Sequence, residues 1–130
     1  MCRFRSMNTS ISATNIFNFQ DLSPGSPFFS QNILRYLSLS NNRIMFIDSP
    51  ECFEGLKHLK ELDLSGNKLA VLREEYKTFR ELSQLEMLDL SNNKLAWIAA
   101  DVFTPLMSLL RLKLDGNRLK GDNIIIRITL

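Results

Sequence analysis

Few side chains in this sequence combine the type and spacing that catalysis or metal binding needs. The chain has one histidine, His58, and two cysteines, Cys2 and Cys52. A zinc site needs about four clustered ligands, and these three residues are neither clustered nor numerous enough. A Ser–His–Asp triad would have to use His58, which precedes an expected strand on its incoming side. There is also no glycine-rich phosphate loop. We therefore predict no enzyme activity, no metal and no cofactor, and expect both cysteines to be unpaired thiols.

Four asparagines occupy the same place in a recurring motif and indicate structural hydrogen bonding instead. Each fills the ninth position of the pattern LxxLxLxxNxL; they are Asn42, Asn67, Asn93 and Asn117. An asparagine side chain both donates and accepts hydrogen bonds. Where the chain turns, it can satisfy backbone groups that would otherwise be buried without a partner. We interpret the four as a structural ladder rather than as ligand-binding residues.

The motif itself predicts the elements that carry these side chains. Its first leucines, Leu34, Leu59, Leu85 and Leu109, are 25, 26 and 24 residues apart. The LxL step alternates, so two leucines point to one face and the residue between them to the other. Short strands repeated at this period stack in parallel at a spacing of about 4.8 Å. This predicts an α/β solenoid: an arc with a short parallel β-sheet on its concave face and loops or short helical turns on its convex face.

The remainder of each repeat is also regular. Phe53, Phe79 and Phe103 are each followed three residues later by a leucine that leads into the next repeat. Their constant place predicts a spine of stacked rings that fills the interior, because a recurring aromatic is far more often a core residue than part of a cofactor site.

The pattern also sets the expected domain boundaries. Residues 33–119 form four repeats. Residues 1–32 are interpreted as an irregular N-terminal segment that can include one degenerate repeat, with an alternating stretch at Ile16–Phe19. Residues 120–130 are a β-prone C-terminal tail, because Ile124–Leu130 has high β-propensity and only Arg127 as a charged break.

Outward-pointing residues of the strands are the expected contact surface. The third motif position holds Tyr36, Glu61, Met87 and Arg111, and the fifth holds Ser38, Asp63, Asp89 and Lys113. Tyrosine, methionine and arginine are enriched in protein interfaces, whereas aspartate and serine at the fifth and seventh positions are common fillers of such repeats. The candidate ligand-binding residues are Tyr36, Glu61, Met87, Arg111, Asp63, Asp89 and Lys113.

The tenth motif position is basic in every repeat: Arg43, Lys68, Lys94 and Arg118. Two interpretations stay open. The residues could form a stripe that binds anions, or they could be ordinary solvated surface whose charge is offset by Glu61 and Asp63.

Composition excludes several classes of function. A hydrophobic content of 45% and a charged content of 23% are those of an ordinary globular protein. The net charge of +2 is too small to argue for nucleic acid. Ser6–Asn15 is polar where a signal peptide would be apolar, and no stretch approaches the roughly 20 apolar residues of a membrane span. We expect no membrane contact by this segment. Asn8-Thr9-Ser10 is a single glycosylation sequon.

Repeats of 24–26 residues with a phenylalanine before the closing leucine resemble the leucine-rich repeats of extracellular receptors. The phrases Leu-Asp-Leu-Ser-Gly-Asn at 62–67 and Leu-Asp-Leu-Ser-Asn-Asn at 88–93 are typical of Toll-like receptor ectodomains. The resemblance covers about two thirds of the chain. It implies an ectodomain that binds a protein or other macromolecular ligand, can pair with a second receptor, and signals in innate immunity through a cytoplasmic TIR domain.

The sequence departs from that family in ways that shape the interpretation. It has no cysteine-rich caps, no membrane span and no TIR domain, so we interpret it as a fragment from the extracellular side of a membrane receptor. The alternative is a cytosolic leucine-rich-repeat adaptor or regulatory protein. Free cysteines and the lack of a signal peptide would favour that alternative.

Overall fold

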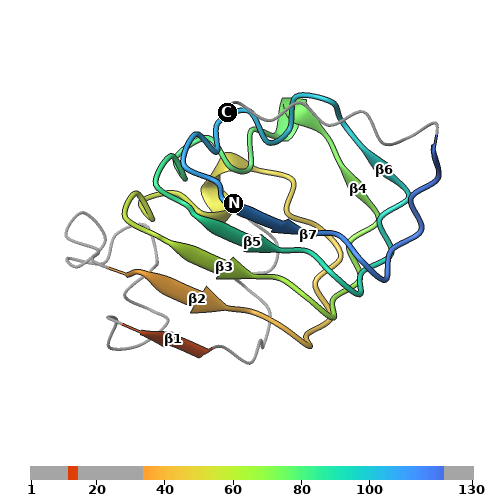
Figure 1. Cartoon of the computed structure of the whole chain (residues 1–130), viewed down its shortest axis with the longest axis horizontal. Coiled ribbons are helices and arrows are strands. Elements are labelled where there is room, and N and C mark those ends of the chain that lie inside the picture. Colours follow the sequence, from red (N-terminus) through yellow and green to blue (C-terminus); the bar gives the residue numbers. More distant parts are fainter. Residues whose placement is uncertain (1–11, 15–33, 122–130) are drawn as a thin grey trace.

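The main feature of the fold is a parallel sheet built from one short strand per repeat. The computed structural model describes residues 12–14 and 34–121. In spatial order the sheet is β1-β2-β3-β5-β7 (Figure 1). The repeats contribute the parallel strands β2 (Tyr36–Ser38), β3 (Glu61–Asp63), β5 (Met87–Asp89) and β7 (Arg111–Lys113). The predicted solenoid arc with its parallel sheet is confirmed.

Equivalent motif positions lie side by side in this sheet. Leu37 is in register with Leu62, Leu62 with Leu88, and Leu88 with Leu112. The differences in repeat length are therefore absorbed outside the strands. Backbone bonds continue the stacking beyond the strand ends, as where Leu64 N donates to Asp89 O at 2.8 Å.

One edge of the sheet was not predicted. Strand β1 (Ser12–Thr14) pairs antiparallel with β2, with Ala13 opposite Leu37. The stretch Ile16–Phe19, where we expected an earlier strand, lies outside the described residues. Pairing at an edge uses backbone groups alone, so a three-residue strand leaves no hydrophobic periodicity to recognise.

The core lies behind the sheet and consists mainly of the motif leucines and the phenylalanines. Phe53, Phe79 and Phe103 are at most 1% exposed. Their rings stack in sequence, with centroids 6.2 Å apart for the first pair and 5.9 Å for the second. This geometry suits offset aromatic stacking, and it confirms the predicted spine.

The convex side combines short turns with a second small sheet. Within residues 34–121 the helical elements are the 3-10 turns η4 (Pro50–Cys52) and η5 (Glu74–Tyr76). Strands β4 (Val71–Leu72) and β6 (Trp97–Ile98) pair in parallel (Figure 1). The turns were predicted and the second sheet was not, because a two-residue strand is too short to show alternation. None of the helices described is long and apolar enough to cross a membrane.

Cys52 corrects an expectation. It is buried at 1% exposure and takes part in a disulfide, although the sequence led us to expect an unpaired thiol. Separation along the chain misled that inference, because a disulfide depends on the distance between cysteines in the folded molecule.

Candidate functional site

The asparagine ladder holds the repeats at a fixed spacing and so positions every exposed column. Asn93 shows its chemistry in full. Its Oδ1 accepts from Leu69 N at 3.1 Å, and its Nδ2 donates to Leu64 O at 3.0 Å and Leu90 O at 3.1 Å. Two of these partners belong to the preceding repeat. With a further bond from Nδ2 to Ser91 O at 3.2 Å, one side chain joins two turns through four backbone groups.

The other ladder residues repeat this arrangement. Asn67 accepts from Ile44 N at 3.1 Å and donates to Leu39 O and Leu64 O, both at 3.0 Å. Asn117 accepts from Leu95 N at 3.0 Å. Asn42 donates to Leu39 O at 2.8 Å. Because Asn67 and Asn93 are also buried, their amides face the backbone rather than any ligand.

The third-position column lies on the outward face of the sheet. Tyr36, Glu61, Met87 and Arg111 are consecutive register partners. Glu61 and Arg111 are exposed, and the other two are half-buried. None of the four side chains makes a hydrogen bond or ion pair with another described residue. These side chains are brought together by the fold and remain available to a ligand.

The fifth-position column lies beside it but is bound into the protein. Asp63 Oδ1 accepts from Ser65 N at 2.9 Å and Ser65 Oγ at 2.6 Å. Asp89 makes the same two bonds to Ser91, at 2.9 and 2.6 Å. Its other oxygen lies 3.7 Å from Lys113 Nζ. These carboxylates stabilise the turn after each strand, which leaves them less free than the third column.

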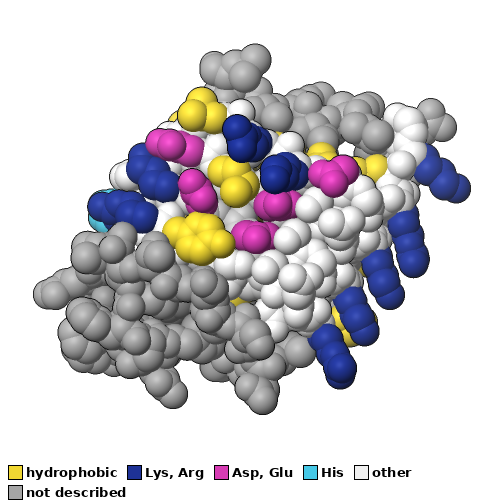
Figure 2. Space-filling model, turned by 60° about the horizontal axis from the view of Figure 1, so that its bottom comes forward, with side chains coloured by type: hydrophobic (Ala, Val, Ile, Leu, Met, Phe, Trp, Pro, Cys, Tyr) yellow, Lys and Arg dark blue, Asp and Glu magenta, His cyan; other side chains and the backbone are white. Residues whose placement is uncertain are grey.

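The outward face of the sheet carries charges of both signs. Figure 2 shows Lys and Arg side chains interspersed there with acidic and hydrophobic ones. One pair, Lys60 and Glu86, has its Nζ and Oε1 atoms 3.0 Å apart. This ion pair was not predicted, because each residue precedes its strand and the contact depends on how the repeats stack. A face of mixed charge suits a partner with polar and apolar groups better than a uniformly charged one.

The tenth-position residues form a separate surface at the turn that follows each strand. Arg43, Lys68, Lys94 and Arg118, here named the basic edge, are all exposed. Figure 2 shows Lys and Arg side chains projecting one after another along one edge of the molecule. One of the two interpretations had Glu61 and Asp63 offsetting this charge, but neither forms an ion pair with any of the four.

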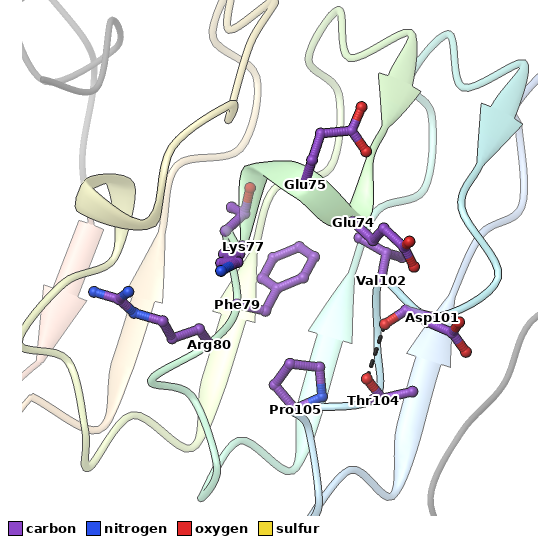
Figure 3. A pocket seen from close by; sticks show the side chains of 10 residues that line it. Glu74, Glu75, Lys77, Phe79, Arg80, Asp101, Val102, Thr104 and Pro105 are labelled. Atoms are coloured by element: carbon purple, nitrogen blue, oxygen red, sulfur yellow. Dashed lines mark hydrogen bonds between the residues drawn. The ribbon is translucent and has the colours of Figure 1, made fainter.

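A pocket on the convex side was not foreseen. Its volume is about 450 Å³, and it lies between η5 and the turn of the next repeat. Figure 3 shows Phe79 and Pro105 lining it, with Glu74, Arg80 and Asp101 among the charged residues around them. The longer, 26-residue repeat carries the 3-10 helix η5, whereas the following 24-residue repeat has only hydrogen-bonded turns at the equivalent place. A motif count cannot show the gap that such a mismatch leaves.

Residues considered for catalysis do not converge. His58 is exposed. Among residues 12–14 and 34–121 no group of three His, Cys, Asp or Glu side chains could hold a metal ion.

The repeats of this chain match a known protein family. Leucine-rich-repeat family models match residues 15–69 and 75–119, and a second such model matches residues 58–81. No curated protein matches the chain significantly.

Solved structures with the same arc include a Toll-like receptor, in the TLR13–ssRNA13 complex. The two share 27% identity with a TM-score of 0.59, over 73% of this chain and 14% of that one. A leucine-rich-repeat protein of Leptospira interrogans is 28% identical with a TM-score of 0.52, over 74% of this chain and 31% of that one. The chain thus spans less than a third of either protein.

Proposed function

Because this chain belongs to the leucine-rich-repeat family, we propose that it is a recognition segment of an innate-immune receptor of the Toll-like kind. It binds a protein or other macromolecule through the outward face of its parallel sheet. The coarser role, a module for interaction with proteins, is typical of the family. The likeness to a Toll-like receptor supports the finer one.

One observation carries the proposal: the contrast between the two columns on that face. The fifth column is held by hydrogen bonds within its own repeats, so it is already committed. The third column presents Tyr36, Met87 and Arg111 without such bonds, and these are residue types that dominate binding energy in interfaces. Four strands at about 4.8 Å spacing present only about 15 Å of this column. A standard interface of about 800 Å² per partner is larger, so neighbouring repeats of a parent receptor would complete the site.

A photo-crosslinking residue tests the site directly. We place benzoylphenylalanine at Met87 in one form of the protein and at Lys57, an exposed residue outside the sheet, in another. Both are expressed in cells that produce the protein naturally. The proposal expects a discrete adduct from position 87 that disappears when Tyr36 and Arg111 are changed to alanine. Equal labelling from both positions, or none from position 87, would contradict it.

The compartment provides an independent test. Disulfides persist in oxidising compartments and are rare in the cytosol, so the bonded Cys52 supports the extracellular side. The expected result is no reactive thiol in the unreduced protein, two thiols after reduction, and a mass shift on enzymatic removal of a glycan at Asn8. Two reactive thiols and no glycan in protein from its native source would favour the cytosolic adaptor instead.

A further inference from the structure

The basic edge is held in register by the backbone. Lys68 N donates to Ile44 O at 2.9 Å, Lys94 N to Leu69 O at 2.8 Å, and Arg118 N to Leu95 O at 2.8 Å. Each basic residue also follows directly after a ladder asparagine, which fixes where its turn begins. Neighbouring cations are therefore about one strand separation apart, so that the row of four is about 15 Å long.

Among the described residues, no ion pair neutralises the charge on this edge. Lys60, Arg73 and Lys113 each lie within 4 Å of a carboxylate. No member of the basic edge has such a partner in the described part of the chain. Like charges aligned along a surface raise the local positive potential and attract anions. The edge thus differs from the sheet face, although the net charge of the whole chain is small.

The length of this row of cations favours a linear polymer over a small anion as the ligand. A small anion such as phosphate can contact one or two neighbouring side chains. A linear polymer with an anionic group every few ångströms can contact all four at once, and it gains from releasing the counterions at each contact.

The residues beside the edge decide between nucleic acid and polysaccharide. Single-stranded nucleic acids are held in grooves where bases stack on aromatic rings. Phe46, Val71 and Trp97 hold equivalent positions in the neighbouring row of residues. Phe46 and Trp97 are each 40% exposed, but Val71 between them has no ring. The ring of Trp97 is already covered by the guanidinium of Arg73, 5.4 Å from its centroid. The cations project from an edge rather than lining a groove (Figure 2). The two exposed rings in this row are therefore not consecutive and form no continuous platform for stacked bases, whereas a sulfated sugar chain requires only the aligned cations.

We propose that Arg43, Lys68, Lys94 and Arg118 bind a linear sulfated polysaccharide of the glycosaminoglycan class along the edge of the solenoid. Sulfate groups contact the ammonium and guanidinium groups in succession. The site is separate from the third column, so both ligands can be held together. Encounter with such a polymer rests on the extracellular placement in the proposed function; the binding chemistry does not.

Binding of the full chain to immobilised heparin tests the proposal. The variant Lys68→Gln/Lys94→Gln/Arg118→Gln removes three charges from the edge. The control Lys57→Gln/Lys77→Gln/Arg80→Gln removes three exposed charges elsewhere. At physiological salt we expect the edge variant to lose about tenfold or more in affinity and to show a shallower salt dependence, since fewer counterions are released. The control should lose less than about twofold, and Lys68→Arg/Lys94→Arg should bind as the original does.

Equal loss in both triple variants would overturn the proposal in favour of non-specific attraction to charge. Tighter binding to single-stranded RNA of equal length, or to vesicles with anionic lipid, than to heparin would overturn it in favour of those partners. Thermal unfolding of each variant checks that the fold is intact. Tyr36→Ala/Met87→Ala should leave heparin binding unchanged, which separates this site from the sheet face.

Discussion

Asn93 and Lys94 are neighbours in the chain, and each belongs to a polar column that recurs in all four repeats. The Asn93 side chain turns inward, and it bonds four backbone groups of two repeats. The residue is 6% exposed. The Lys94 side chain turns outward and bonds nothing in the described part of the chain. Two equally regular columns, one residue apart, thus have opposite roles. Periodicity identifies a column, whereas the direction of its side chains decides whether it stabilises the fold or faces a partner.

Among the tests of this contrast, the substitution Asn93→Ala has the largest expected effect. It leaves the buried Leu69 N without its acceptor, which costs about 1–3 kcal/mol. Leu64 O and Leu90 O each lose one donor but keep another, the Nδ2 atoms of Asn67 and Asn117. Each of the two hydrogen bonds lost at these carbonyls contributes about 0.5–1.5 kcal/mol more, so we expect the free energy of unfolding to fall by about 3 kcal/mol in total. Urea unfolding followed by circular dichroism measures it. The matched control, Lys94→Ala, should change stability by less than about 0.5 kcal/mol; similar losses in the two variants would remove the distinction.

Gly66→Ala tests the position just before the ladder. Gly66 has φ of +68°, and a Cβ there would lie 2.3 Å from Asn41 Oδ1 of the preceding repeat. A residue forced into this region costs about 1–3 kcal/mol. We expect a loss of about 2 kcal/mol, between those of Asn93→Ala and Lys94→Ala. Asn41→Gly combined with Gly66→Ala removes the clash and should recover part of the loss. No recovery would show that backbone conformation alone sets the cost.

Asp89→Ala extends the comparison to the sheet face and has a smaller expected effect. It removes the acceptor for Ser91 N and Ser91 Oγ, and hydrogen bonds to charged groups contribute about 1.5–3 kcal/mol. Asp89 and Ser91 are buried, and removing the carboxylate also removes the cost of burying its charge, so we expect about 1–2 kcal/mol. Glu61→Ala, which removes a side chain without such bonds, is the control for thermal unfolding. A larger effect from Glu61→Ala would mean that the two columns have been assigned in reverse.

Much of the fold could be predicted because each repeat encodes its own local geometry. Leu62 and Leu64 alternate with Asp63, which requires a strand with one buried face, and the same spacing elsewhere sets the register. The constant place of Phe79 among the three spine residues made its burial predictable for the same reason. These inferences needed only the chain near each residue.

The features that escaped prediction all depend on segments that are distant in sequence. Strand β1 joins the sheet through backbone pairing with β2, β4 meets β6 across a whole repeat, and Cys52 is bonded rather than free. The pocket beside Phe79 arises because adjacent repeats differ in length. No local pattern records such contacts, since each depends on which turns come to lie side by side.

Four properties could be derived from the amino-acid sequence alone. They are the repeat, its period, the burial of its leucines and phenylalanines, and the residue types that recur in each outward column. Those properties follow from alternation and spacing, which act over a few residues. Which columns have hydrogen-bond or ion-pair partners within the protein became clear only from the folded structure. Stacking gave Asn67 and Asn93 partners in the preceding repeat and placed Lys113 beside Asp89. Among the described residues it left the side chains of Tyr36 and Arg111 without such partners and the basic edge without an ion pair. A polar side chain is available to an external ligand only where it lacks a partner within the protein. Partners from other repeats depend on how one turn packs on the next.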